Sequence, residues 1–572
     1  MGFEYALVHL KYTIPPGIAL TLLYRPFFNR LDLYKIVFLI SIAVVSTIPW
    51  DSYLIRRKIW TYPPHVIVGP TLFDIPAEEV FFFVIQTYNT SLLYLLLSKP
   101  VFHPAYLPNH KHHTNKLNLG HAILAILVVG GGWLIWRGKE GTYMGLILAW
   151  AGPFALLLWS LSSHFLLNLP WTSTVAPIAI PTIYLWVVDT LALKRGTWTI
   201  ESGTKFGVHL WDGLEIEEAV FFLATNILIV FGLVAFDHAM GILLTFPKMF
   251  PNVPELPSPV MLVQALLTHV SEYDTDRVVG IQQAMQRLKK KSRSFYLASS
   301  TFSGRLRIDL ILLYSFCRVA DDLVDNASSE AEAQARIISK EANVHAYISE
   351  NFPDSAQAAL RLLPTHLLSY GPLYELLEGF KTDLEFPEKD SAKLLQFPIE
   401  GEGDLEVYAA RVAGTVAELC LELVFFHSYS TTIAAQRDQL IRAGGRMGVA
   451  LQYINIARDI ATDAAIGRVY LPTSWLKSQG LIPQNILENP DRSGIEKLRG
   501  TLLDKAFGVY REANSAISQL PVDARAPMRV AVESYMEIGR VLTEKGHKVK
   551  EGKATVPKIR RLKVAWKALN AG

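Results

Sequence analysis

Two acidic segments in the second half of the chain say most about its fold: Cys317-Arg-Val-Ala-Asp-Asp-Leu-Val-Asp325 and Gln452-Tyr-Ile-Asn-Ile-Ala-Arg-Asp-Ile-Ala-Thr-Asp463. In each, carboxylates recur four residues apart within an apolar helical pattern, which places them on one face of a helix. Acids on an apolar face are costly unless something neutralises them. Two such faces offer the oxygen ligands that Mg²⁺ prefers, and Mg²⁺ often bridges to substrate phosphates. The pattern therefore predicts a helical domain that acts on a diphosphate.

Charged residues are unevenly distributed along the 572 positions. Residues 1–250 carry 16 Lys and Arg and 14 Asp and Glu, whereas the rest of the chain carries 39 Lys and Arg and 38 Asp and Glu. The low charge density of the first part indicates a membrane domain at residues 1–250, followed by an all-α domain at 271–572. Between them, residues 251–270 begin with four prolines in nine positions and are expected to form a linker. Because the chain has only two cysteines, we expect no disulfide framework and a cytosolic second domain.

The first part is expected to be a multi-pass integral membrane domain in contact with lipid. Apolar runs of about 20 residues, the length that a helix needs to cross a bilayer, predict seven spans at residues 5–24, 33–50, 79–98, 119–136, 143–168, 172–193 and 216–236. Loop charges leave the sidedness of the membrane open. No basic face interleaved with aromatic residues is present, which argues against binding of nucleic acid.

The apolar part also contains an internal repeat. The second copy follows the first at an offset of 138 or 139 residues: Asp51 recurs as Asp189, Trp60 as Trp198, and Ile75–Phe82 as Leu214–Phe221. One extra residue in the second copy explains the change of offset. We therefore expect each copy to contain three spans, with one further helix in the domain.

Paired glutamates begin one span in each copy: Glu78 with Glu79, and Glu217 with Glu218. Ionisable residues in a span are expensive and indicate function. If the copies face each other, these carboxyls converge, and a protonated one can act as a general acid while an ionised neighbour stabilises a carbocation. The alternative is that both pairs lie at headgroup level as ordinary first-turn acids, which suits the helix dipole.

Basic and small side chains accompany the aspartates of the second half. Arg318, Arg458 and Arg468 are suited to bind diphosphate oxygens, together with any metal that the carboxylates hold. The small residues of Tyr408–Thr415 permit close approach of helices. The alternative is that the acids pair with arginines on solvated helix faces, with no functional consequence.

Residues of about 275–560 resemble the squalene/phytoene synthase family through Ala320–Asp325, Gln452–Asp463 and Gly467–Pro472, and also through Leu377–Leu384. The resemblance implies a class I isoprenoid synthase fold with a central cavity. It implies head-to-head condensation of two prenyl diphosphates through a cyclopropyl diphosphate. We expect geranylgeranyl diphosphate as the substrate and phytoene as the product, although the pattern does not fix the length of the prenyl chain. The resemblance also implies roles for individual residues: Asp321, Asp322, Asp325, Asn455, Asp459 and Asp463 as ligands of Mg²⁺ or Mn²⁺, Ser292, Ser294, Arg318, Gln452, Arg458 and Arg468 at the diphosphate, and Tyr314 and Tyr408 in catalysis.

Two features qualify this resemblance. Lys291 stands where several relatives carry His, which leaves the role of this position open. Lys289–Lys291 could bind the substrate or equally form a basic patch against anionic lipid. Squalene synthases usually add a C-terminal anchor and an NADPH-dependent reduction, whereas the basic end, Lys545–Lys567, has no apolar run of spanning length. This favours the phytoene branch, without NADPH. The alternative is a squalene synthase-like domain fused to a non-catalytic anchor or a transporter-like module.

The glutamate segments resemble the small membrane lycopene cyclases, which occur as two subunits in some bacteria and as a tandem fusion in fungi. The resemblance implies acid-catalysed closure of lycopene ends into β-ionone rings, giving β-carotene. Glu215 stands where the first copy has Pro76, which leaves open which copy is catalytic. No Gly-x-Gly-x-x-Gly follows a strand pattern, so a flavin site is not expected. Both halves together resemble the fungal bifunctional enzymes of carotenoid biosynthesis, with lycopene supplied by a separate desaturase.

Overall fold

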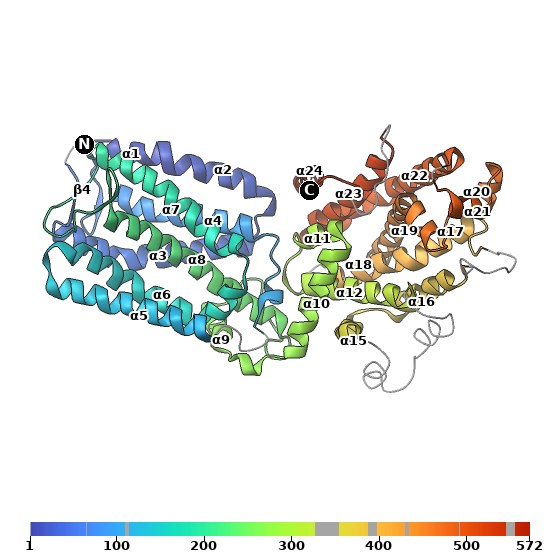
Figure 1. Cartoon of the computed structure of the whole chain (residues 1–572), viewed down its shortest axis with the longest axis horizontal. Coiled ribbons are helices and arrows are strands. Elements are labelled where there is room, and N and C mark those ends of the chain that lie inside the picture. The colour runs from blue at the N-terminus through green and yellow to red at the C-terminus, as the bar shows by residue number, and fades with distance from the viewer. Residues whose placement is uncertain are drawn as a thin grey trace. The chain divides into compact units, whose positions relative to one another are not determined.

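The computed structural model describes residues 2–63, 66–108, 114–325, 354–386, 397–428, 434–490, 492–544 and 555–571. It divides into two compact units, Met1–Val278 and Val279–Gly572, and both are built of helices (Figure 1). The predicted all-α class is confirmed.

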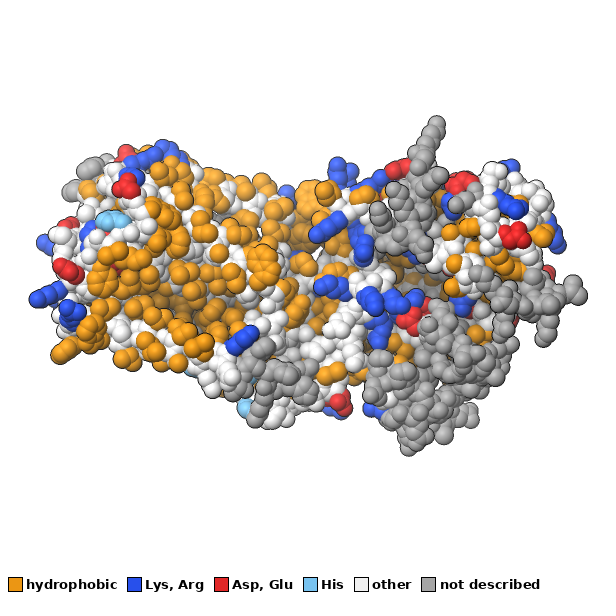
Figure 2. Space-filling view, viewed as in Figure 1, with side chains coloured by type: hydrophobic (Ala, Val, Ile, Leu, Met, Phe, Trp, Pro, Cys, Tyr) orange, Lys and Arg blue, Asp and Glu red, His pale blue; other side chains and the backbone are white. Residues whose placement is uncertain are grey.

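Seven long helical segments build the N-terminal unit: Glu4–Phe27 (α1 Glu4–Val8, η1 His9–Thr13, α2 Ile14–Tyr24 and η2 Arg25–Phe27), α3 (Arg30–Arg56), α4 (Ala77–Ser98), α5 (Thr114–Arg137), α6 (Thr142–Asn168, after η4 Lys139–Gly141), α7 (Trp171–Lys194) and α8 (Ile216–Thr245). Each is long and apolar enough to cross a membrane, as the seven predicted spans require. Hydrophobic side chains cover much of the surface of this unit (Figure 2).

The three-helix repeat is visible in the structure. The segment Glu4–Phe27, α3 and α4 correspond to α6, α7 and α8, and α5 is the additional helix. The copies join through strands β1 (Trp60–Thr61) and β4 (Thr199–Ile200), which pair antiparallel. The hairpin β2 (Thr71–Leu72)–β3 (Ile75–Pro76) corresponds to β5 (His209–Trp211)–β6 (Leu214–Glu215), and the extra residue lies in an irregularity between His209 and Trp211.

The segment after the last span contains a helix that belongs to the N-terminal unit. Helix α9 (Pro259–Leu267) lies within the stretch expected as a linker. The Ser258 hydroxyl caps it by accepting from the Met261 backbone N–H at 3.3 Å, and Pro259 occupies the first turn. Leu262 and Ala265 are buried in the same core as α8. Short turns η3 (His103–Tyr106) and η5 (Val270–Glu272) complete the unit.

The C-terminal unit is a bundle around α19 (Ala434–Ala465), which contacts helices on several sides. The other elements are α10 (Thr275–Lys291, which starts in the first unit), α11 (Arg293–Ser299), α12 (Gly304–Asp325), α15 (Asp354–Arg361), η6 (Thr365–Leu367), α16 (Tyr370–Leu384), α17 (Glu402–Ala409), η7 (Ala410–Gly414), α18 (Thr415–His427), α20 (Thr473–Ser478), α21 (Pro483–Glu488), α22 (Ser493–Ala513), η8 (Asn514–Gln519), α23 (Val522–Leu542) and α24 (Lys558–Asn570).

A glycine contact sets the position of α19. A Cβ built on Gly448 would lie 2.4 Å from the carbonyl oxygen of Ala413, so only glycine fits where α19 crosses η7. This agrees with the close helix approach predicted from the small residues of Tyr408–Thr415. The contact holds the acidic segment of α19 at a fixed distance from the neighbouring helices.

Candidate active sites

A cavity of about 890 Å³ lies in the C-terminal unit, between α10–α12 on one side and α16–α19, η7 and α23 on the other. It brings together most residues predicted for a synthase site: Ser292, Ser294, Tyr314, Arg318, Asp321, Tyr408, Gln452, Asn455, Arg458, Asp459, Asp463 and Arg468. Asp322 is tied to the same wall by its ion pair with Arg318. The side chain of Asp325 lies outside the described residues.

Each acidic segment is paired with an arginine of its own helix. Arg318 contacts Asp321 at 2.5 Å and Asp322 at 2.7 Å, and Lys291 lies 3.2 Å from Asp322. Arg458 binds Asp459 through two N–H groups, at 2.7 and 2.5 Å. The acids therefore do pair with arginines, as the alternative interpretation expected. Arg318, Asp321, Arg458 and Asp459 nevertheless line a cavity and not a solvated helix face. Such guanidinium groups match the geometry of a diphosphate.

Asp463 is a buried carboxyl that lies near a second aspartate, Asp459. Burial, and then the nearby charge of Asp459, raise the pKa of the Asp463 carboxyl well above its usual range. A divalent cation beside these two carboxylates would favour their ionised forms, and carboxylate oxygens suit Mg²⁺. Among the residues that the structure describes, no three His, Cys, Asp or Glu side chains are gathered closely enough to form a metal site on their own. The donor set thus fits a cation shared with a ligand's oxygens.

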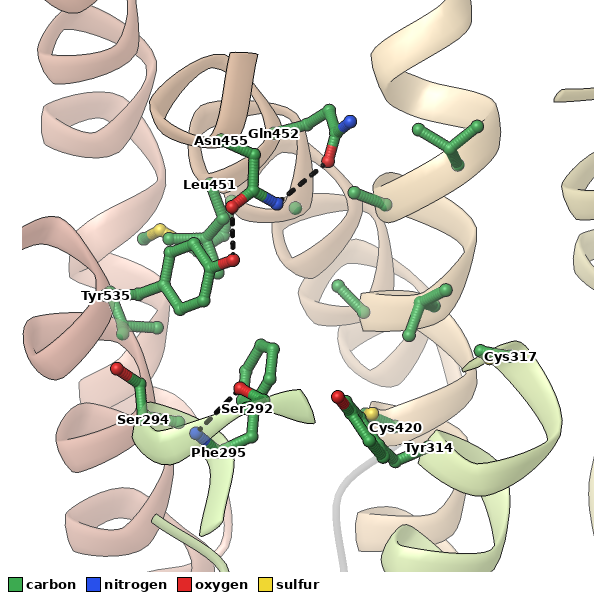
Figure 3. Close-up of a pocket in the computed structure, with 18 of the residues that line it drawn as sticks. Ser292, Ser294, Phe295, Tyr314, Cys317, Cys420, Leu451, Gln452, Asn455 and Tyr535 are labelled. Carbon is green, nitrogen blue, oxygen red and sulfur yellow. Dashed lines mark hydrogen bonds between the residues drawn. The ribbon is translucent and has the colours of Figure 1, made fainter. Parts of the chain in front are cut away.

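A polar network orients Asn455. Its amide N–H donates to Gln452 Oε1 at 3.1 Å, and the hydroxyl of Tyr535 donates to Asn455 Oδ1 (Figure 3). The Tyr535 ring stacks on Phe295, with centroids 5.1 Å apart. Burial raises the pKa of Tyr314, across the cavity, to about 12, so this phenol stays neutral. Tyr535 was not predicted, because it lies in no acidic or basic pattern.

A second residue outside the predicted set is Asp383. It is buried, lines the cavity, and accepts hydrogen bonds from Tyr408 at 3.0 Å and Tyr470 at 2.7 Å. The two tyrosine rings stack with centroids 4.9 Å apart. Asp383 lies in the Leu377–Leu384 segment that carries part of the family resemblance, and this signal could have identified it.

In the N-terminal unit, one glutamate of each pair faces a buried polar centre. Glu79 accepts hydrogen bonds from the hydroxyls of Tyr5 and Tyr62, the latter at 2.7 Å. Glu218 accepts from Tyr143 at 2.6 Å. Tyr5 and Tyr143 are equivalent positions of the repeat, 138 residues apart. All four glutamates are buried, and Glu79 and Glu218 are the ones whose carboxyls the tyrosine hydroxyls bind.

The other glutamate of each pair binds backbone. Glu78 accepts the N–H of Val68 at 2.7 Å, and Glu217 accepts the N–H of Phe206 at 2.7 Å. Both bonds anchor the loop that precedes the helix. Glu215, in place of the first copy's proline, accepts from Lys205 at 2.7 Å.

Two aspartates complete the centre. Asp51 and Asp189 are fully buried and interact electrostatically with both Glu79 and Glu218. Within the described part of the chain, neither carboxyl oxygen of Asp51 has a hydrogen-bond partner. The sequence patterns identified both aspartates only as markers of the repeat. Their position inside apolar spans was a signal for function that could have been used.

The two copies contribute reciprocally to this centre. Trp60 of the first copy packs against Tyr143 of the second at 5.9 Å between ring centroids, and Trp198 of the second packs against Tyr5 of the first at 5.1 Å. Such reciprocal contacts are typical of a two-fold arrangement. Trp50 stacks on Phe221 at 5.5 Å beside the centre. Aromatic faces next to carboxylates are suited to stabilise a cation.

The C-terminal unit combines an all-helical bundle with a cavity lined by aspartate–arginine pairs, as in a prenyl-synthase type of domain. Residues 288–562 match the squalene/phytoene synthase family. The whole chain is 57% identical to a bifunctional lycopene cyclase/phytoene synthase of Leptosphaeria maculans and 56% identical to that of Pyrenophora tritici-repentis, with complete coverage of all chains. A crystal structure of a dehydrosqualene synthase aligns over 51% of this chain and 96% of its own, with 22% identity and a TM-score of 0.41. The chain belongs to the family of bifunctional lycopene cyclase/phytoene synthases.

Proposed function

We propose that the chain is a bifunctional enzyme of carotenoid biosynthesis, a prenyltransferase and a cyclase in one polypeptide. The C-terminal unit condenses two geranylgeranyl diphosphates to phytoene, and the N-terminal unit closes the ends of lycopene into β-ionone rings. The observation that carries this function is full-length similarity to proteins of that name, together with one acidic centre in each unit. A separate desaturase would convert phytoene to lycopene between the two steps.

In the C-terminal unit, arginines and amides bind the diphosphate. Arg318, Arg458 and Arg468 face the cavity beside the aspartates, and Ser292, Ser294 and Gln452 add neutral donors. Mg²⁺, or Mn²⁺ in its place, would be held by Asp321, Asp322, Asp325, Asn455, Asp459 and Asp463, and would neutralise charge on the departing diphosphate. Binding of diphosphate would draw Arg318 and Arg458 away from their carboxylate partners. The apolar and aromatic walls, with Tyr314 and Tyr408, shelter the allylic cation from water. No NADPH step is expected.

In the N-terminal unit, the four carboxyls of the buried centre supply and recover a proton. These inner carboxyls are those of Asp51, Glu79, Asp189 and Glu218. A protonated carboxyl of Glu79 or Glu218 donates its proton to a terminal carbon–carbon double bond of lycopene, and the resulting cation is attacked by the neighbouring double bond to close the ring. A carboxylate of the same centre then removes a proton from the ring, so no net redox change occurs. Until that proton is removed, the aromatic side chains that pack around Trp50 stabilise the cation. No flavin is required for this sequence of proton transfers.

We infer that the seven apolar helices found among the described residues cross a membrane and contact lipid, which their length and composition support. We place the C-terminal unit in the cytosol, where the diphosphate substrate is soluble. The fusion keeps both activities at one membrane, where the apolar intermediates dissolve, and a desaturase would share that membrane.

Product analysis in a host without carotenoids tests the proposal. The full chain is expressed with a geranylgeranyl diphosphate supply, with and without a desaturase that forms lycopene. Phytoene is expected in the first strain and β-carotene in the second. Squalene-type products that require NADPH, or lycopene that accumulates without cyclisation, would contradict the proposed function.

A further inference from the structure

Helix α24 is fixed to the C-terminal unit by one of its faces. Ala565 and Ala568 are buried in a small core that also contains Ala298 of α11 and Val530 of α23. Arg560 pairs with Glu537 of α23 at 2.6 Å, and with Glu544 at 2.5 Å. The orientation of α24 is therefore set by packing and by ion pairs, and its opposite face is turned outward.

The outward face of α24 carries large apolar side chains flanked by lysines. Ile559, Leu562 and Trp566 are 82%, 48% and 43% exposed, and their spacing of three and four residues places them on one stripe. Three exposed lysines flank this stripe: Lys558, Lys563 and Lys567. None of the three forms an ion pair with a residue that the structure describes. Exposed tryptophan and aliphatic residues beside lysines are typical of a helix at a lipid–water interface.

This stripe adjoins the synthase cavity. Thr555 and Val556, which lead into α24, and Arg561 within it all line the cavity. Lys290 and Lys291 at the end of α10 line it as well. Lys and Arg side chains gather over the part of the unit where α10, α11 and α24 lie (Figure 2). The basic surface, the apolar stripe and the cavity wall are thus parts of one region.

We infer that the outward face of α24 docks on a bilayer surface that carries anionic headgroups. Ile559, Leu562 and Trp566 enter the interface, and the lysines contact lipid phosphates. An anionic bilayer fits both features, because the apolar stripe matches the acyl-chain region and the lysines match the negatively charged headgroups. If the proposed condensation occurs in this cavity, its hydrocarbon product leaves beside lipid rather than into water.

Fluorescence of the full chain in lipid nanodiscs tests this docking. Leu562→Cys is labelled with an environment-sensitive dye, with the unsubstituted protein subtracted as background for Cys317 and Cys420. Ile482→Cys is the matched control, because Ile482 is also an exposed aliphatic residue and caps α21, remote from α24 within the same unit (Figure 1). The dye at position 562 is expected to shift to shorter wavelength when phosphatidylserine is added to phosphatidylcholine, and to revert at high salt, whereas the dye at 482 stays constant.

Neutralisation of Lys558, Lys563 and Lys567 by glutamine should lower the docked-to-undocked ratio by about fivefold for each lysine, because each contributes about 1 kcal/mol at an anionic surface. An unchanged dye signal in these variants, or docking that is equally strong on phosphatidylcholine alone, overturns the inference. A rise in KM for the diphosphate substrate without any change in docking would assign the lysines to substrate capture instead. Phytoene formation by the same variants is measured in detergent solution, so that loss of docking is separated from failure of the proposed function.

Discussion

The structure predicts opposite outcomes for the two members of the first glutamate pair. Glu79 lies among the inner carboxyls and is bound by Tyr5 and Tyr62, whereas Glu78 accepts the backbone N–H of Val68. Glutamine has nearly the same shape as glutamate and keeps a carbonyl oxygen as hydrogen-bond acceptor, but it cannot donate an acidic proton. Glu79→Gln and Glu78→Gln are therefore a matched pair of variants that differ in position by one residue.

Glu79→Gln should lower cyclisation by about 10²–10⁴-fold, the usual contribution of a general acid or base. Both tyrosine bonds to its side chain survive as neutral bonds, so the unit should still fold. Glu78→Gln should leave cyclisation within a few-fold of the parent. Its bond to Val68 changes from charge-assisted to neutral, which costs about 1 kcal/mol of stability.

The assay is conversion of lycopene to β-carotene in membranes that contain the full chain, followed by chromatography. Phytoene formation by the same membranes is the internal control, and the thermal midpoint of purified protein reports stability. Glu218→Gln and Glu217→Gln repeat the comparison in the second copy. Equal loss of cyclisation in Glu78→Gln and Glu79→Gln, with both proteins folded, would refute the division into tyrosine-bound and backbone-bound carboxyls.

Three further predictions follow from the two sites and from the helix contact that holds one of them. Asp459→Ala should abolish phytoene formation and leave cyclisation of supplied lycopene intact; loss of both activities in folded protein would argue against independent sites. Asp51→Asn and Asp189→Asn should each reduce cyclisation at least tenfold, an estimate on the scale of one catalytic carboxyl, and β-carotene yields at the parental level would exclude these aspartates from the proton-transfer centre. Gly448→Ala should destabilise the C-terminal unit by about 1–3 kcal/mol because its Cβ meets the Ala413 carbonyl. The control Gly508→Ala, in open space on α22, should be neutral or slightly stabilising in thermal unfolding. Equal unfolding midpoints for the two variants would show that the helices at the crossing shift apart at little cost.

Much of the architecture could be predicted because it depends on local periodicity. Apolar runs of spanning length predict seven long helices in the first half, and seven helices of that length and composition occur among the described residues. The repeat was visible because equivalent landmarks keep a constant offset, and the structure explains the one-residue slip as an irregularity in β5. Asp321 and Asp459 could be assigned to one cavity because each stands in a segment with a specific family resemblance.

The members of each site that come from distant segments could not be predicted in this way. Tyr5 binds Glu79 across 74 positions of sequence, and Tyr143 binds Glu218 across 75. Tyr535 reaches Asn455 from α23, 80 positions away. None of these tyrosines belongs to a pattern that marks it, since an aromatic residue in an apolar helix is ordinarily part of the core.

The amino-acid pattern was sufficient to specify the helices, the duplicated copies and the acidic composition of both sites, because these depend on residue type and spacing along one segment. Which glutamate of each pair faces the buried centre, and that Asp51 and Asp189 join it, were decided only by tertiary packing. The physical reason is that consecutive residues of a helix point about 100° apart. Helix packing decides which side of the helix faces the other copy of the repeat. Two adjacent glutamates such as Glu78 and Glu79 do not reveal that side, because they are identical residues.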